Sequence, residues 1–137
     1  MMKKIMMLLL LVSTFLGAAS LQLETGYTTA LAKAQKENKP VMLVLSSHQC
    51  RYCDLFDSET LSDSMVIEAL NRDFVSAIVY AAQGEYAPEI LITGATPTIW
   101  FLQPNGDPMF QPIMGAVGKE DFVKALAIVH EEYLKGQ

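Results

Sequence analysis

The most constraining feature of this sequence is a pair of cysteines in the run Cys50-Arg51-Tyr52-Cys53, because the 137 residues contain no other cysteine. The apolar run before it, residues 41–45, has the length and composition of a buried strand, and helical spacing begins just after it. Cys50 is therefore predicted at a helix N-terminus, where unpaired N–H groups and the helix dipole favour the thiolate. Arg51 adds a permanent positive charge. A pair placed in this way is suited to cycle between a dithiol and a disulfide.

A structural disulfide is the other use that an exported protein makes of two cysteines. A bridge between Cys50 and Cys53 would close a segment of only four residues. Closing so short a loop removes little conformational entropy from the unfolded chain, so the bridge would stabilise a fold weakly. The spacing therefore favours redox chemistry.

The first 19 residues have the pattern of a secretory signal peptide. Lys3 and Lys4 precede an apolar run over residues 5–16, and small residues follow at 17–20. The run is shorter than the roughly 20 residues that usually span a membrane. We expect cleavage near Ala19 or Ser20 and export of the rest of the chain, with retention of the segment as a membrane anchor as the alternative.

The remaining residues, 20–137, are enough for one domain and too few for two. They carry eight Lys or Arg against fifteen Asp or Glu, a formal charge of −7. This charge disfavours nucleic acid and anionic lipid as partners. The sequence shows no dimerisation segment, and we expect a monomer.

Helical and strand patterns alternate along this domain. A helix is expected over residues 25–38 with Thr25 as its N-cap, a second from the cysteines to about residue 60, and a third with Asp63 as its N-cap. A strand over 74–81 then completes a strand-helix-strand unit with parallel strands. Beyond it the sequence predicts a short helix at 86–91, a strand at 99–102, an antiparallel return at 109–114 after the turn Asn105-Gly106, and a final helix at 119–134.

Four local features make residues 25–134 resemble the thioredoxin superfamily. They are Cys50-Arg51-Tyr52-Cys53 at the strand end, Ala87-Pro88-Glu89-Ile90, Ala95-Thr96-Pro97-Thr98, and Asn105-Gly106 followed by Gly115-Ala116-Val117-Gly118. Zinc sites also use Cys-x-x-Cys, so the Thr-Pro-Thr run makes the combination specific. The chain is most similar to the exported thioredoxin-related proteins that reduce or exchange disulfides in the bacterial periplasm. The resemblance implies an α/β thioredoxin fold, with a central mixed β-sheet flanked by helices on both faces.

The resemblance also implies a role for individual residues. Cys50 would be the nucleophile that forms a mixed disulfide with the substrate, and the more buried Cys53 would resolve it. Pro97 would follow a cis peptide bond and present the backbone of Thr96 to an extended substrate. A plain strand-start proline is the alternative for Pro97. His48 is a candidate to tune the Cys50 thiolate, and a solvated loop side chain is its alternative role.

The sequence departs from cytosolic thioredoxin at several positions. Gln49 stands before the first cysteine, and Arg51-Tyr52 between the two, where that protein has tryptophan and Gly-Pro. Val44 occupies the position of its buried aspartate, so the resolving step needs another proton acceptor, either water or a nearby carboxylate. The first strand is reduced to residues 21–23, which we expect to be absent or loosely paired.

These observations predict a periplasmic thiol:disulfide oxidoreductase that acts mainly as a reductase or exchanger, with no dissociable cofactor and no metal. Its partners would be disulfide-containing or dithiol proteins, and a membrane protein would supply electrons. A thiol oxidase is the alternative, since a stabilised Cys50 thiolate makes the pair more oxidising, although no inserted helical domain is evident. Two further alternatives are an inactive binding module and a copper-binding chaperone that uses His48, Cys50 and Cys53.

Overall fold

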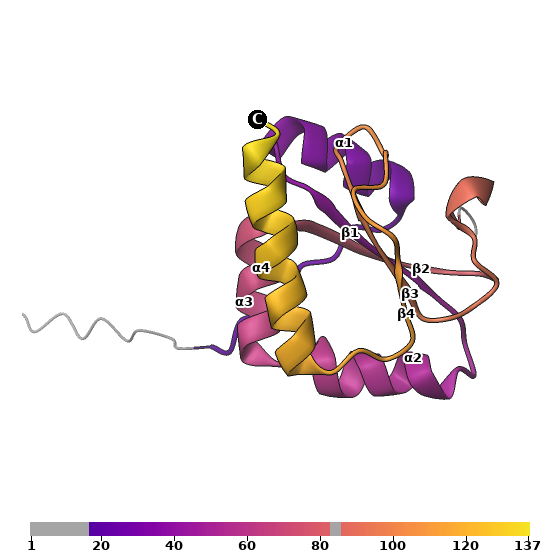
Figure 1. Ribbon diagram of the computed structural model, residues 1–137. Helices are drawn as coiled ribbons and strands as arrows, with labels where there is room; N and C mark the ends of the chain where they lie inside the picture. The colour runs from indigo at the N-terminus through magenta and orange to yellow at the C-terminus, as the bar shows by residue number, and fades with distance from the viewer. Residues whose placement is uncertain (1–16, 83–85) are drawn as a thin grey trace, which may run out of the picture.

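A computed structural model describes residues 17–82 and 86–137 (Figure 1). The predicted apolar run of the signal peptide lies outside the described residues, and the limits of the predicted signal and domain stay predictions. Within the described part of the chain, no helix has both the length and the apolar character needed to cross a membrane.

The described strands form one four-stranded sheet in the order β2-β1-β3-β4. The central strand β1 (Val41–Ser46) runs parallel to β2 (Val75–Tyr80), as the strand-helix-strand pattern predicts. β3 (Thr98–Leu102) lies antiparallel on the other side of β1, and β4 (Ile113–Met114) pairs with β3 at the edge. All residues of β1 and β3 are buried, which accounts for their nearly uninterrupted apolar sequences.

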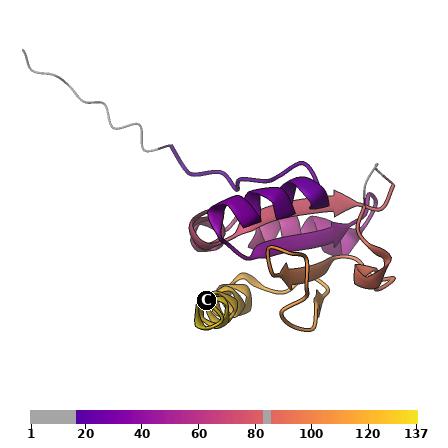
Figure 2. The same cartoon turned by 90° about the horizontal axis from the view of Figure 1, so that it is seen from above.

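Helices cover both faces of the sheet, so the predicted fold class is confirmed. Figure 2 shows α1 (Tyr27–Glu37) on one face and α4 (Lys119–Lys135) on the other. α3 (Ser64–Asp73) packs beside α4. The helix that begins after Cys50 is α2 (Arg51–Leu55), which continues without a break into the π-helical segment η1 (Phe56–Thr60).

The sheet divides the core into two clusters. The larger one is rich in aromatic residues, and Phe56 of η1 meets Phe122 of α4 edge to face there, with ring centroids 5.4 Å apart. The smaller one lies under α1, where Ala30 and Ala34 let the helix approach the sheet closely. Side chains alternate along β1, so Met42 and Val44 enter the first cluster while Val41, Leu43 and Leu45 enter the second.

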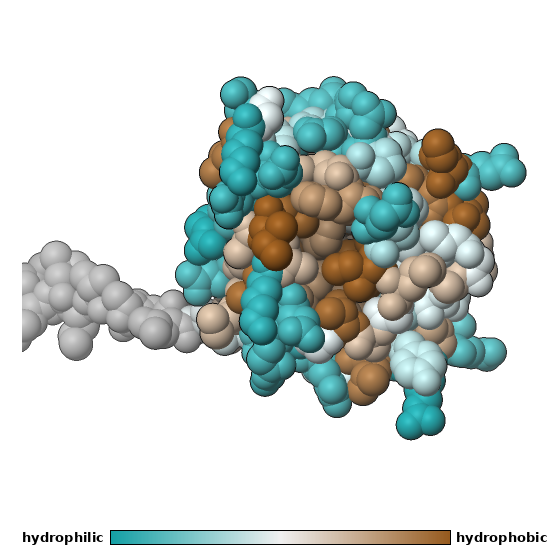
Figure 3. All heavy atoms as spheres, viewed as in Figure 1, coloured by the Kyte–Doolittle hydropathy of each residue, from teal (hydrophilic) through white to brown (hydrophobic). Residues whose placement is uncertain are grey.

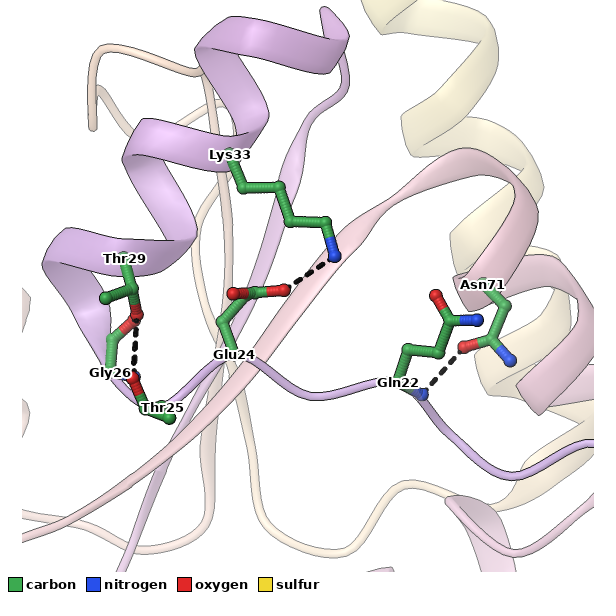
Figure 4. Close-up of polar contacts among 7 residues, drawn as sticks. All are labelled: Gln22, Glu24, Thr25, Gly26, Thr29, Lys33 and Asn71. Carbon is green, nitrogen blue, oxygen red and sulfur yellow. Dashed lines mark hydrogen bonds and ion pairs between the residues drawn. The ribbon is translucent and has the colours of Figure 1, made fainter.

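The N-terminus of α1 differs from the prediction. Gly26, and not Thr25, is the N-cap, and it has an extended backbone. The hydroxyl of Thr29 accepts a hydrogen bond from the Gly26 N–H at 3.0 Å and lies 3.3 Å from the Thr25 hydroxyl (Figure 4). The Thr29 side chain, inside the first turn, therefore provides the hydrogen-bond acceptor for the N-cap N–H. Thr25 is not needed as the N-cap residue.

The segment before α1 is paired loosely, as expected from its sequence. Its one described bridge to the sheet joins Glu24 to Ala77 of β2 in parallel. Side chains hold the rest: Asn71 of α3 accepts from the Gln22 N–H at 2.9 Å, and Lys33 of α1 binds the Glu24 carboxylate at 2.6 Å (Figure 4). The exposed edge of β2 is thereby covered.

The antiparallel return is shorter than predicted. Only β4 pairs with β3 in a ladder, and an isolated bridge joins Leu102 to Pro108. The Met109 N–H still donates to the Phe101 carbonyl at 2.9 Å, and Pro112, which lacks the N–H that a ladder needs, separates this contact from β4. The short helix predicted at 86–91 is a single 3-10 turn, η2 (Glu89–Leu91).

Candidate active site

Cys50 lies at the carboxyl end of β1, where the chain turns from the sheet into α2. Residues 47–49 make this turn, and Gln49 adopts a left-handed backbone conformation with φ of 59°. Cys50 is the N-cap of α2, and its Sγ accepts a hydrogen bond from the Cys53 N–H at 3.2 Å. A backbone donor and the positive end of the helix are therefore directed at the Cys50 sulfur, as the sequence predicts.

Cys50 and Cys53 form a disulfide, with their Cα atoms 5.2 Å apart. The two cysteines differ in exposure: Cys50 is partly exposed, whereas Cys53 is 2% exposed on the inward side of α2. The side chains between them, Arg51 and Tyr52, face solvent. A substrate therefore has access to the Cys50 sulfur and not to the Cys53 sulfur, which is the asymmetry expected of a nucleophile and a resolving cysteine.

The loop before β3 meets the disulfide. The Thr96 hydroxyl lies 3.4 Å from Cys50 Sγ, and the Thr96 carbonyl oxygen lies 3.5 Å from it. Ser47, from the turn after β1, contacts the same hydroxyl at 3.2 Å. The peptide bond between Thr96 and Pro97 is cis, and Pro97 is buried. The fold thus brings the predicted site residues Thr96 and Pro97 to the Cys50–Cys53 disulfide, although Thr96 and Cys50 lie 46 positions apart along the sequence.

The two candidates for tuning the thiolate lie in different surroundings. The His48 ring stacks on the Tyr80 ring at the end of β2, with centroids 4.6 Å apart and planes 3° from parallel. Arg51 is exposed in the first turn of α2. Both residues flank the disulfide, and their effect on Cys50 stays a prediction.

Sequence reasoning did not single out Asp57 and Tyr80, which lie at the same end of the sheet. Burial, followed by the nearby Asp54 carboxylate, raises the pKa of Asp57. Burial also raises the pKa of Tyr80, with smaller contributions from Asp57 and Asp54. In the sequence alone, Tyr80 looks like the last residue of an apolar strand, and Asp57 looks like an ordinary polar residue of a helix. The useful signal was the spacing of four residues between Cys53 and Asp57, which places both on one face of a helix.

Val44 occupies the strand position at which cytosolic thioredoxin has a buried aspartate, so this position is apolar here. Val44 is 1% exposed and lies opposite Ile78 of β2 in the sheet register. As for metals, the described residues include no group of three or more His, Cys, Asp or Glu side chains that is arranged to hold an ion.

The fold and the Cys50–Cys53 disulfide together define a thioredoxin-like thiol:disulfide oxidoreductase. A family model described as the thioredoxin-like domain matches residues 27–130. The chain belongs to this family, and the resemblance stated from its sequence is confirmed.

Solved structures agree with this assignment. A thioredoxin from Thermus thermophilus is 32% identical, with a TM-score of 0.70, over 81% of this chain and 88% of that one. The oxidoreductase DsbH shares the fold, with a TM-score of 0.68 at 20% identity over 83% of this chain and 87% of that one.

Spermatogenesis-associated protein 20 from Rattus norvegicus is 28% identical over 90 residues, which are 63% of this chain. The chain spans only 11% of the rat protein and 12% of its human counterpart. The similarity therefore concerns one domain of a much longer protein.

Proposed function

We propose that this protein is an exported disulfide reductase or exchanger that acts on proteins in the bacterial periplasm. The observation that carries the proposal is the asymmetric disulfide: Cys50 is accessible at a helix N-terminus, and Cys53 is buried one turn later. In the reduced protein, the Cys50 thiolate attacks a substrate disulfide and releases one substrate thiol. Cys53 then displaces the second substrate thiol and re-forms the Cys50–Cys53 disulfide.

The surface around Cys50 favours a polypeptide substrate. The backbone of Thr96 borders the sulfur, where an extended chain can pair with it as an added strand. Apolar side chains reach the surface nearby: Tyr52 between the cysteines is 62% exposed. Hydrophobic atoms also gather on the side of the molecule that carries η2 (Figure 3), where Ile90 and Ile92 are exposed.

The small size of the domain favours reduction over oxidation as the direction of the reaction. The described elements are one sheet with its covering helices, and no helical domain of the kind inserted in dedicated thiol oxidases occurs among them. Work as a reductase in an oxidising compartment requires a membrane protein that supplies electrons. Export itself rests on the leader pattern of residues 1–19, and the mass of the mature protein recovered from the periplasm tests it.

The equilibrium reduction potential of the Cys50/Cys53 pair tests the proposal. A potential near that of thioredoxin, about −270 mV, supports electron donation to substrates. A potential near about −120 mV overturns the direction and makes the protein a thiol oxidase. If the pair shows no reversible two-thiol transition, the protein is not an oxidoreductase of this type.

The Cys53→Ser variant tests whether proteins are the substrates. Without the resolving cysteine, Cys50 should remain joined to its substrate as a mixed disulfide that survives under non-reducing conditions. Cys50→Ser is the matched control and should trap nothing. If periplasmic extracts yield no covalent complex with the Cys53→Ser variant, proteins are not its substrates.

A further inference from the structure

Cys53 must lose a proton before it can resolve a mixed disulfide, because the thiolate and not the thiol is the nucleophile. Its side chain is buried, so solvent reaches the sulfur poorly. The sheet beneath offers no proton acceptor at this position, since Val44 and the residue opposite it, Ile78, are apolar. The acceptor must therefore come from another element.

Asp57 is the carboxylate that the helix places beside Cys53. Residues four apart along a helix are neighbours on its surface, and α2 runs directly into η1. The inward stripe of this helix is Cys53, Phe56 and Thr60, all buried, and Asp57 lies next to that stripe and is half-buried. The wider π-helical turn, closed by the hydrogen bond from Leu61 N–H to the Phe56 carbonyl at 3.0 Å, begins just before Asp57.

Tyr80 bounds the same region from the sheet. Side chains alternate along β2, so Tyr80 projects to the same face as Ile78, which is the face that the helix covers. Burial raises the pKa of the Tyr80 hydroxyl, and the Asp57 carboxylate raises it further. His48 stacks on the Tyr80 ring from the turn after β1. The ionisable groups around Asp57 are thus Asp54 on its own helix, Tyr80 on β2 and His48 behind it.

We propose that Asp57 accepts the Cys53 proton in the resolving step, directly or across one water molecule. This inference rests on the proposed function. The Cys53 S–H bond breaks and its proton passes to the Asp57 carboxylate. The Cys53 thiolate attacks Cys50 Sγ, the new S–S bond forms, and the bond from Cys50 to the substrate sulfur breaks. The substrate sulfur leaves as a thiolate with the electron pair, so the substrate is reduced and the cysteine pair is oxidised.

The surroundings of Asp57 suit this task. Burial and the neighbouring Asp54 raise the pKa of Asp57, which makes its carboxylate a stronger base than a fully solvated one. Protonation also removes a negative charge from a half-buried position beside Asp54. Proton transfer from Cys53 is therefore better matched to Asp57 than to the exposed Asp54.

A two-phase reaction separates the attack by Cys50 from the resolution by Cys53. The fully reduced protein is mixed with dithiobis(nitrobenzoate), a symmetric aromatic disulfide whose thiol product is coloured. Attack by Cys50 releases the first equivalent of product, and attack by Cys53 releases the second. Rates of both phases are recorded across a range of pH for wild type, Asp57→Asn, Asp57→Glu and the matched control Asp54→Asn.

We expect Asp57→Asn to slow the second phase by about 100-fold and to leave the first phase unchanged. In the wild type the second-phase rate should rise with pH as Asp57 ionises, and this limb should be missing from Asp57→Asn. Asp57→Glu should restore both the rate and the limb. Asp54→Asn should stay within about twofold of wild type in both phases, because its carboxylate points to solvent.

The proposal is overturned if Asp57→Asn keeps the wild-type rate and pH profile in the second phase. If Asp57→Asn does not fold, a wild-type second phase that lacks the acidic limb overturns it equally. Failure of the proposed function is a different result: it is read from the reduction potential of the Cys50/Cys53 pair, which does not depend on how fast Cys53 resolves a mixed disulfide.

Discussion

The two ends of the sheet use polar side chains in opposite ways. At the amino ends of β1 and β2, polar groups are paired with one another: the Tyr133 hydroxyl donates to Asn38 at 2.7 Å, and the Arg72 guanidinium binds Asp73 at 2.9 Å. At the carboxyl ends, a reactive disulfide, the half-buried Asp57 and the exposed Tyr52 lie close to the surface. The comparison indicates that one end stabilises the fold and that the other carries the chemistry.

The amino end is also where separate elements are joined. Tyr133 connects the last turn of α4 to the C-cap of α1, and Asn71 connects α3 to the segment before α1. His130 of α4 lies 3.6 Å from the same Asp73 carboxylate that Arg72 binds. Substitutions at the two ends should therefore separate loss of activity from loss of stability.

The largest effect should follow from Cys50→Ser at the carboxyl end. We expect complete loss of disulfide reduction, because serine cannot form the mixed disulfide. Under reducing conditions the free energy of unfolding should stay within about 0.5 kcal/mol of reduced wild type, since Cys50 is partly exposed. Measured reduction of a protein disulfide by this variant at the wild-type rate would contradict the division of roles.

Next in size should be Asn71→Ala at the amino end. Asn71 accepts from the Gln22 N–H at 2.9 Å and donates to the Ser20 carbonyl at 2.8 Å. Loss of both hydrogen bonds should lower the free energy of unfolding by about 1 to 2 kcal/mol, with no change in activity. Urea unfolding and the disulfide-reduction rate measure the two properties. Faster hydrogen exchange at the Glu24 amide, which donates to the Ser76 carbonyl, should accompany the loss.

Tyr133→Phe should have a smaller effect of the same kind. It removes only the hydroxyl that donates to Asn38 and keeps the buried ring. We expect a loss of about 1 kcal/mol, seen as a lower urea midpoint with an unchanged slope. A variant that loses activity without losing stability would show that the amino end also acts on the site.

The smallest effect should be that of Asp57→Asn on stability, measured in the disulfide form. Burial raises the pKa of Asp57 above its ordinary value of 3.8, so the folded state binds this proton more tightly than the unfolded state does. Stability therefore falls as pH rises from about 3.8 through the raised pKa, and the deficit persists above it. Asparagine does not ionise. The variant should be slightly more stable than wild type at neutral pH, and the difference should vanish below pH 3.8.

Most of the fold could be predicted from the sequence, because its signals are local. The apolar runs of β1 and β2 and the helix capped by Asp63 indicate a parallel unit without any tertiary information, and the structure confirms it. The N-cap of α1 could not be predicted, since it depends on whether the Thr29 hydroxyl turns back to Gly26. The length of β4 depends on how two prolines meet an edge strand.

The candidate site likewise contains some residues that could be predicted from the sequence and others that could not. Cys50 and Cys53 are neighbours in sequence, and Pro97 follows a recognisable run, so they could be found before the fold was known. Asp57 and Tyr80 gain their meaning from burial and from which face of β2 meets the helix. Those properties are set by packing between elements, and the sequence of a single segment does not contain them.

The loosely paired segment before α1 has a practical consequence for immobilisation. The described chain enters at the side of the molecule where α3 lies, and α2 begins at the opposite side (Figure 1). A sensor surface, bead or fluorescent reporter attached ahead of residue 20 would therefore lie on the side of the domain that is opposite the start of α2. Substrates in solution would still reach the disulfide, so binding and turnover could be recorded on an N-terminally anchored layer of this protein.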